Sequence, residues 1–228
     1  MEFIMHIVSI HSFYKNYPWR EHTMLLVPLV LITCTIVFRY GMWGLPVADA
    51  FRELRDSSTA VTAFMHLISD WGNIFLDSIY ADILLRSWRT QDSHGKIFSL
   101  SYAMAAVLYL CIVLQIVKYG LGMPRPGIPG PPHPWSSHAY TSFPSGHTAH
   151  IIAAALPLAF WYRSRILSFG LSLLIGLMGL SRVWLGEHHP VDLLGSIVFG
   201  SLVVMCLYYL LLCADTDRWQ RKSEPKKA

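Results

Sequence analysis

Long apolar runs separated by short polar stretches make up most of the chain between residues 24 and 213. A helix needs roughly 17–25 residues to cross the hydrocarbon core of a bilayer. Six apolar segments can be counted, at residues 24–38, 59–85, 98–117, 145–162, 166–180 and 193–213. The pattern predicts an all-α protein: a six-span transmembrane helical bundle that forms a single domain over residues 1–228.

The six segments differ in how well they fit a membrane span. Segments 98–117 and 193–213 are long enough, whereas the first, fourth and fifth are short unless flanking aromatic residues extend them. The second segment is the most polar, and part of it could lie along the membrane surface. A carboxylate in the membrane must face protein or water. We therefore expect Asp77 and Asp82 to pack at polar edges between helices or to line the inner mouth of the bundle; the sequence assigns no role to Asp70 in the same segment.

Composition supports a membrane protein. The chain is 54% hydrophobic and 14% charged, against about 25% charged residues in soluble domains. The net charge of +4 comes largely from the tail after Cys213, which is typical of an orientation signal and a contact with acidic lipids, not of a nucleic-acid site. The four cysteines form no Cys-x-x-Cys pair, so neither a disulfide framework nor a zinc site is indicated. The first apolar run begins late and lacks a clear cleavage site, which favours a retained span.

Three short polar blocks interrupt the apolar pattern. They are Lys118–Pro126, Pro144–His147, and Ser181-Arg182 followed by His188 and Asp192. Each block stands where an apolar run begins or ends. The stretch between the first two blocks is rich in proline and aromatic residues, so it is predicted to be a loop that covers or rims a site.

The remaining Lys and Arg residues are distributed unevenly between the two sides of the predicted bundle. Twelve fall on the side of the two termini and three on the other side. The twelve are Lys15, Arg20, Arg86, Arg89, Lys96, Arg163, Arg165, Arg218, Arg221, Lys222, Lys226 and Lys227, and the three are Arg39, Arg52 and Arg55. Positive residues favour the cytoplasm. Both termini are therefore predicted to be cytoplasmic, and all three polar blocks are predicted to meet at the outer, periplasmic face.

The basic residues of the blocks suit a phosphate group. Lys118 offers a compact ammonium, and Arg125 and Arg182 offer planar forks that match phosphate oxygens in pairs. A single basic residue near a membrane end usually extends to the interface. Three of them beside glycine, proline and histidine residues are not well explained in that way.

The second block predicts the start of a helix. Ser145 can serve as the N-cap, and Gly146 lets the backbone approach a ligand closely. The free N–H groups at such an end attract an anion, although an ordinary capped helix would have the same sequence. His147 favours a site, because a histidine placed there can donate a proton to a leaving oxygen.

The third block holds a possible nucleophile. If the last helix begins near Pro190, the Asp192 carboxylate can accept a hydrogen bond from one ring nitrogen of His188 and leave the other nitrogen free to attack phosphorus. His189 competes for this role, and the spacing by itself does not exclude it.

Together the blocks resemble the three signature motifs of the type 2 phosphatidic acid phosphatase family of membrane lipid phosphatases. The family pattern is Lys, six residues, Arg-Pro; then Pro-Ser-Gly-His; then Ser-Arg, five residues, His, three residues, Asp. Every fixed position is matched across the signature core, residues 118–192.

This resemblance implies roles for individual residues. His188 resembles the nucleophile that forms a phosphohistidine, which decides against His189, and Asp192 resembles its orienting partner. His147 resembles the general acid. The implied phosphate cradle consists of Lys118, Arg125, Ser145, Gly146 and Arg182. No metal and no cofactor are expected, since the cations supply the charge stabilisation.

The implied function is hydrolysis of a phosphate from a membrane lipid in a bacterial inner membrane. The candidate substrates are phosphatidic acid, phosphatidylglycerol phosphate, undecaprenyl pyrophosphate and lipid A. A lipid phosphotransferase would use the same residues. A transporter or membrane scaffold is the non-enzymatic alternative, but a transporter would place its polar groups near the midplane of the membrane. The sequence does not indicate an oligomeric state.

Overall fold

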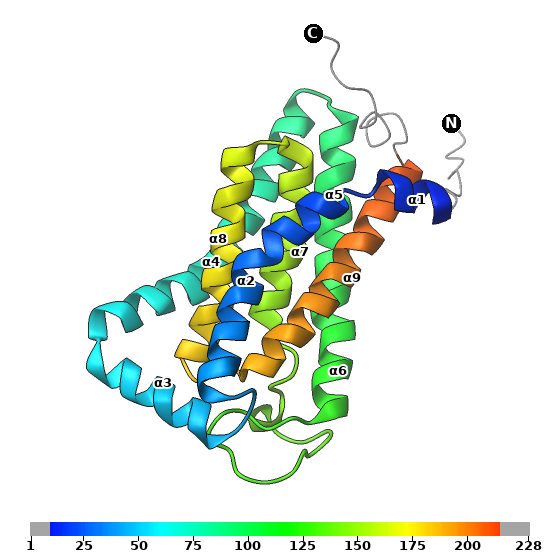
Figure 1. Ribbon diagram of the computed structural model, residues 1–228. Helices are drawn as coiled ribbons and strands as arrows, with labels where there is room; N and C mark the ends of the chain where they lie inside the picture. The colour runs from blue at the N-terminus through cyan, green and yellow to red at the C-terminus, as the bar shows by residue number, and fades with distance from the viewer. Residues whose placement is uncertain (1–9, 215–228) are drawn as a thin grey trace.

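The computed structural model describes residues 10–214, and these residues form helices and loops without a strand (Figure 1). The prediction of an all-α protein is confirmed. The helices are α1 (Ile10–Asn16), α2 (Trp19–Tyr40), α3 (Leu45–Ser57), α4 (Thr59–Arg89), α5 (Ser93–Leu108), the π-helical turn η1 (Tyr109–Val113), α6 (Leu114–Leu121), the 3-10 turn η2 (His138–Tyr140), α7 (Gly146–Tyr162), α8 (Arg165–Trp184) and α9 (Pro190–Ala214).

Each of the six predicted apolar segments corresponds to one helix or one continuous helical run. The third segment is inside the run formed by α5, η1 and α6, and four others are inside α2, α4, α8 and α9. The fourth segment, residues 145–162, begins at the N-cap residue that precedes α7. Apart from α7, the helices are longer than the apolar segments because polar and aromatic residues extend them. Trp19 and Tyr40, for example, are the first and last residues of α2.

Polar caps mark several of the helix starts. The side chain of Asp92 accepts hydrogen bonds from the N–H groups of His94 and Gly95 at 3.0 and 3.2 Å, at the start of α5. Ser58 and Ser164 each accept one backbone N–H at 3.4 Å, at the starts of α4 and α8. These bonds satisfy N–H groups that have no partner inside the helix, so the breaks between apolar segments are encoded locally.

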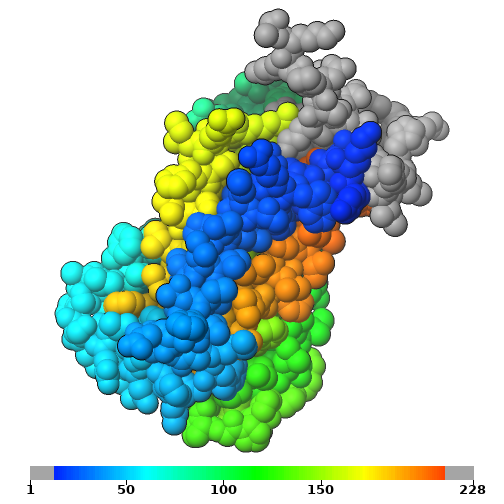
Figure 2. Space-filling view, in the orientation of Figure 1, coloured from blue at the N-terminus to red at the C-terminus, as the bar shows by residue number. Residues whose placement is uncertain are grey.

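Helix α7 is the centre of the bundle. Residues 151–160 are all buried, and α7 packs against α4, α8 and α9. Helix α2 packs along α8, where a side chain at Gly179 would place its Cβ 2.2 Å from Leu29. Helix α3 and the first part of α4 form a V that projects from the bundle (Figures 1 and 2).

Four helical runs are long and apolar enough to cross a membrane. They are Trp19–Tyr40, Ser93–Leu121, Arg165–Trp184 and Pro190–Cys213. Helix α7 has only 17 residues, and the polar residues of α4 lower its hydropathy. Large apolar side chains are exposed on the outside of the bundle, with Phe38 at 94% and Trp71 at 61%. A surface of this kind needs a lipid environment, so the chain is an integral membrane protein.

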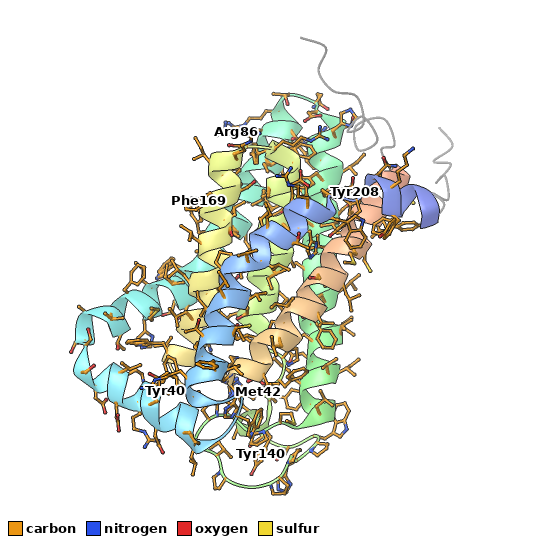
Figure 3. All side chains as sticks on the ribbon, viewed as in Figure 1. Tyr40, Met42, Arg86, Tyr140, Phe169 and Tyr208 are labelled. Carbon is orange, nitrogen blue, oxygen red and sulfur yellow. The ribbon has the colours of Figure 1, made fainter. Side chains whose placement is uncertain are left out.

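The two ends of the bundle differ in character. One end holds the ends of α6 and α8, the starts of α7 and α9, and the loop of residues 122–145 (Figure 1). Tyr140 lies at this end, and Arg86 and Tyr208 lie at the opposite end (Figure 3). Seven of the twelve basic residues predicted on the side of the termini are described, and they are also at that opposite end. The other five, from Arg218 to Lys227, lie outside the described residues.

Candidate active site

The three polar blocks meet at one cavity. It has a volume of about 660 Å³ and lies at the end of the bundle where α6 and α8 terminate and α7 begins. Six of the eight predicted site residues line it, namely Lys118, Arg125, Gly146, His147, Arg182 and His188. Asp192 is directly behind His188, and Ser145 is buried outside the lining.

The first block enters the cavity because α6 ends abruptly. Gly122 has φ 59°, and a Cβ at this position would lie 2.2 Å from the backbone of His133. Only glycine accepts both constraints readily. The loop then folds back, with Arg125 N–H donating to Ala139 at 2.9 Å. Lys118, in the last turn of α6, donates from Nζ to the carbonyl of Thr141 at 2.8 Å, which positions its ammonium at the cavity wall.

The second block starts α7 as predicted, but its serine is used differently. Ser145 is at the N-cap position, yet its Oγ pairs with Thr148 Oγ1 at 3.0 Å and not with a backbone N–H. Its own N–H donates to the carbonyl of Asp192 at 3.3 Å. A Cβ at Gly146 would lie 3.1 Å from Leu114 and 3.7 Å from Lys118, so the glycine lets α7 approach α6 closely. Ser145 thus ties the second block to the third.

The third block depends on the turn between α8 and α9. Gly186 has φ 73°, and the N–H groups of Glu187 and His188 both donate to the carbonyl of Arg182, at 3.1 and 3.2 Å. The Arg55 guanidinium from α3 donates to the carbonyl of Trp184 at the end of α8. A positive charge at a helix C-terminus is stabilising. This turn directs His188 into the cavity.

His188 and Asp192 form the predicted pair. His188 Nδ1 lies 3.2 Å from Asp192 Oδ2, and both residues are buried. The same oxygen accepts the Ser142 hydroxyl and, at 2.8 Å, the N–H of His189. With Nδ1 bound to the carboxylate, Nε2 is the nitrogen available to a substrate. Burial, together with the charges of Lys118, Arg182 and Arg125, lowers the pKa of His188 well below its ordinary value, which favours the neutral ring.

The competing histidine has a different environment. His189 does not line the cavity, and its ring stacks on Trp43 with the centroids 3.8 Å apart. Its backbone N–H holds Asp192, but its side chain packs against the loop between α2 and α3. The geometry therefore agrees with His188 as the reactive residue.

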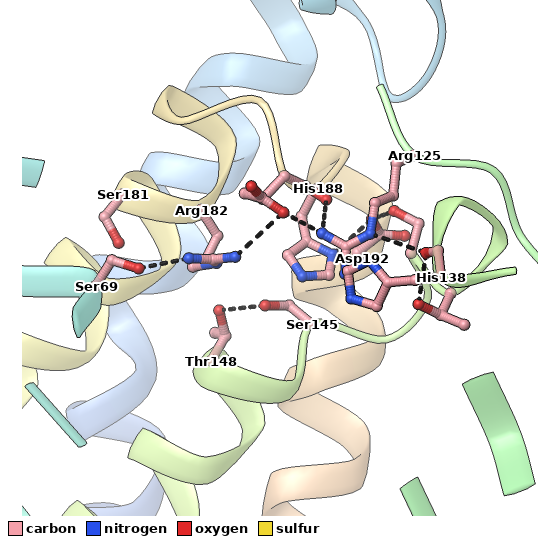
Figure 4. A network of polar contacts seen from close by, with 12 residues as sticks. Ser69, Arg125, His138, Ser145, Thr148, Ser181, Arg182, His188 and Asp192 are labelled. Carbon is pink, nitrogen blue, oxygen red and sulfur yellow. Dashed lines mark hydrogen bonds and ion pairs between the residues drawn. The ribbon is translucent and has the colours of Figure 1, made fainter. Parts of the chain in front are cut away.

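Two guanidinium groups meet in the cavity and share a carboxylate. Arg125 Nη1 pairs with Glu187 Oε2, and Arg182 Nη2 lies 3.6 Å from the same oxygen (Figure 4). Arg182 also donates to Ser69 on α4. Glu187 is 43% exposed at its side chain, so it can leave this position. A phosphate that bound both guanidinium groups would replace this carboxylate.

The loop contributes a further basic group. His138 Nε2 lies 3.1 Å from Arg125 Nη2, and its ring lines the cavity. The positive charge of Arg125 lowers the pKa of His138, and burial lowers the pKa of Arg125. The positive charge at this end of the cavity comes from Lys118, Arg125 and Arg182, and it suits an anionic ligand.

Sequence reasoning missed several residues of the site. Glu187 and His138 lie between the fixed motif positions, and Ser142 lies two residues before the start of the second motif at Pro144. Ser69 and Asn73 come from α4, whose Asn73 side chain donates to the carbonyl of His147 at 3.3 Å. No pattern in the sequence distinguishes these serine and asparagine residues from others in polar segments.

The donor set of the cavity is cationic, not metal-ligating. Within residues 10–214, no three His, Cys, Asp or Glu side chains gather in a way that could hold a metal ion. The four cysteines, all within this range, are free. Metal independence stays a prediction.

Comparison with known proteins agrees with these motifs. Residues 96–213 match the PAP2 superfamily. The chain is 28% identical over 158 residues to undecaprenyl-diphosphatase BcrC of Bacillus subtilis (strain 168), which covers 69% of this chain and 78% of that protein. It is 30% identical over 139 residues to lipid A 1-phosphatase of Rhizobium etli, which covers 52% of this chain and 56% of that protein. No solved structure matches the chain.

The matched region extends over more than half of the chain and contains all three polar blocks. The same blocks surround one cavity that joins a buried His–Asp pair to three basic side chains. On these grounds the chain belongs to the PAP2 superfamily.

Proposed function

We propose that this lipid phosphatase removes the terminal phosphate of a lipid phosphate or pyrophosphate through a phosphohistidine on His188. One observation carries the proposal: His188, held by Asp192, faces the same 660 Å³ cavity as Lys118, Arg125 and Arg182. A neutral nucleophile beside three cations suits attack on an anionic phosphorus centre.

In the first step, Nε2 of His188 attacks phosphorus and the bond from phosphorus to the leaving oxygen breaks. Lys118, Arg125 and Arg182 bind the non-bridging oxygens, whose negative charge they stabilise in the transition state. Protonated His147 donates its proton to the leaving oxygen, so that the lipid departs as an alcohol or as a lipid phosphate. The Asp192 carboxylate stabilises the positive charge that the His188 ring acquires.

In the second step, water attacks the phosphorus of the phosphohistidine and the phosphorus–nitrogen bond breaks. His147, now neutral, accepts a proton from this water, and inorganic phosphate leaves. Both histidines then have their starting protonation states. The step needs no metal, since the basic side chains supply the positive charge, and no cofactor.

The lipid part of the substrate has an apolar path to the cavity. Ile74, Leu110 and Leu114 line the cavity on the side of α4, η1 and α6. The outer surfaces of these helices carry exposed apolar residues, among them Phe75 at 60% and Ile116 at 57%. A lipid can therefore keep its tail in the bilayer while its phosphate reaches the basic end of the cavity.

The proposed reaction is tested by measuring phosphate release in detergent from phosphatidic acid, phosphatidylglycerol phosphate, undecaprenyl pyrophosphate and lipid A 1-phosphate. At least one lipid is expected to release inorganic phosphate. A chelator is expected to leave the rate within about twofold of the rate without chelator, since side-chain cations stabilise the charge. Release from none of the lipids rejects the proposed function. Strong inhibition by the chelator contradicts only the metal-free mechanism.

A phosphotransferase would use the same residues but a second lipid in place of water. Following labelled phosphate distinguishes the two, because a transferase moves the label to another lipid and releases none as free phosphate. A transporter or scaffold would release no phosphate in either form. Hydrolysis is favoured because the relatives matched are named as phosphatases.

We also propose a topology of six spans, with α4 and α7 crossing the membrane as well as the four apolar helical runs. Helix α7 tolerates its short length because it is enclosed by other helices. The excess of Lys and Arg on the side of the termini supports cytoplasmic termini and a periplasmic active site in a bacterial inner membrane.

The topology predicts which surface positions a membrane-impermeant maleimide reaches in intact bacteria whose outer membrane it can cross. Ser136→Cys, in the exposed loop before α7, is expected to be labelled, and Arg165→Cys, at the start of α8, is expected to be labelled only after lysis. The wild-type chain measures the background from its own cysteines. Labelling of Arg165→Cys but not Ser136→Cys in intact cells would reverse the orientation.

A further inference from the structure

A second polar cluster, made of Asp77, Tyr102 and His150, lies in the active-site region. Tyr102 donates to Asp77 Oδ1 at 2.6 Å, and His150 Nε2 lies 3.1 Å from the same oxygen. The hydroxyl of Tyr102 is also 3.2 Å from His150 Nε2. The three residues come from α4, α5 and α7, and Asp77 and His150 line the cavity that contains His188. The proposed hydrolysis does not use this cluster.

A regular row of residues on α4 shows where the cluster stands relative to the reacting groups. Ser69, Asn73 and Asp77 are four residues apart and all line the cavity. Successive members of such a row are about 6 Å apart along the helix axis. Ser69 accepts from Arg182, Asn73 donates to the carbonyl of His147, and Asp77 pairs with His150.

This row places the phosphate cradle, the proton donor and the cluster in that order along the cavity. His150 is also three residues beyond His147 on α7, about 4.5 Å further along the axis and away from the end that carries His188. Since His147 donates to the leaving oxygen, the group attached to that oxygen extends toward Asp77 and His150.

The cluster offers hydrogen-bond acceptors to this group. Within the cluster, the two contacts of Asp77 both end on its Oδ1, and the third joins the Tyr102 hydroxyl to His150 Nε2. No hydrogen bond to Asp77 Oδ2 or His150 Nδ1 is formed within residues 10–214. The side chains are 43% and 15% exposed, and both line the cavity. With His150 donating through Nε2, its Nδ1 is an acceptor. Two acceptors on residues that line the same cavity match a ligand that carries O–H or N–H donors.

The charge in this part of the cavity restricts the ligand further. The Asp77 carboxylate faces this side, whereas Asp70, next to Ser69 on α4, lines the cavity nearer the phosphate cradle. A second phosphate directly next to the leaving oxygen would meet the negative charge of Asp77, and like charges at close range are unfavourable. A hydroxyl- or amide-bearing carbon group attached to the leaving oxygen would place no charge there.

We propose that Asp77 and His150 form a specificity subsite for the leaving group, and that the preferred substrate is a lipid phosphate monoester with a hydroxyl or amide N–H a few bonds from the scissile oxygen. Tyr102 positions the Asp77 carboxylate. The inference rests on the proposed phosphatase reaction and narrows its substrate class. Phosphatidylglycerol phosphate, with its glycerol hydroxyl, and lipid A 1-phosphate, with its sugar amide, meet the requirement. Phosphatidic acid and undecaprenyl pyrophosphate do not.

The inference is tested by kcat/KM values for these four lipids with the wild type, Asp77→Ala and His150→Ala. The wild type is expected to prefer the two donor-bearing lipids. Each variant is expected to lose about 10- to 100-fold on those lipids, as for loss of a hydrogen bond to a charged or buried group, and to change less than about threefold on the other two. Ser78→Ala is the matched control, because Ser78 is exposed on the same helix and bonds only to Phe75 within the described chain.

The outcomes separate this subsite from a purely structural polar cluster. A structural role predicts equal losses on all lipids and on the soluble ester para-nitrophenyl phosphate, and equal losses would overturn the inference, as would unchanged values. Asp77→Asn keeps the side-chain volume and gives a second measurement if Asp77→Ala does not fold. A wild type that favours phosphatidic acid or undecaprenyl pyrophosphate also overturns it. Absence of phosphate release from every lipid instead rejects the proposed function itself.

Discussion

His188→Ala is expected to lower phosphate release by about 10⁴-fold or more, as removal of a covalent nucleophile commonly does. The neutral ring faces the cavity with Nε2, while Nδ1 is held by Asp192 at 3.2 Å. Alanine removes the only atom that forms the covalent intermediate in the proposed mechanism. The rate is measured as inorganic phosphate released from the best lipid substrate, in detergent, at matched concentrations of folded protein.

His189→Ala is the matched control for this variant. It removes the neighbouring imidazole but keeps the backbone N–H that donates to Asp192. The His189 ring stacks on Trp43 outside the cavity lining, so this variant is expected to keep activity within about tenfold of the wild type. Acid-labile phosphate on the wild type and His189→Ala, but not on His188→Ala, would identify the intermediate. Comparable activity of His188→Ala and the wild type would reject His188 as the nucleophile.

Arg182→Gln is expected to lower kcat/KM by about 10²- to 10³-fold, as loss of one donor to a developing negative charge does. The guanidinium is buried, with Ser69 on one side and the Glu187 carboxylate on the other, so it is already oriented before substrate binds. Glutamine cannot supply the positive charge or the paired N–H groups. Steady-state kinetics with the same lipid give the measurement.

Two further variants separate the effect of geometry from that of charge. Arg182→Lys keeps the charge but loses the planar fork, so a partial loss, smaller than that of Arg182→Gln, is expected. Arg52→Gln removes a charge from the same end of the bundle, where Arg52 pairs with Asp49 on exposed α3, and should leave the kinetics unchanged. If Arg182→Gln and Arg52→Gln had equal effects, Arg182 would act only through the general electrostatic field.

The helices could be predicted from the sequence because their signals are local. An apolar run and a polar break are visible in consecutive residues, and Asp92 or Ser164 caps a helix within three residues of itself. The start of α9 at Pro190 is also a local signal, and it places Asp192 in the first turn of that helix. Span number is harder to read, because α7 is protected by its neighbours and not by its own hydropathy.

The candidate site was only partly predictable, because some of its contacts join distant parts of the chain. The motifs contain the cations and histidines, and the structure gathers six of these residues around one cavity. Ser145 was expected in the phosphate cradle, but its hydroxyl bonds to Thr148 and its N–H to Asp192. Glu187 falls at a variable motif position, and its pairing with two arginines depends on how the turn after α8 folds.

The sequence by itself determined which residue types are available for the proposed chemistry: three basic residues, a histidine proposed as proton donor, and a histidine four residues before an aspartate. These follow from residue types and short spacings, which do not depend on the rest of the fold. Only the tertiary structure decided which histidine faces the cavity and which residues of α4 lie opposite α7. The physical reason is that orientation and inter-helix contact depend on packing between α4, α7 and α8, segments separated by many residues along the chain.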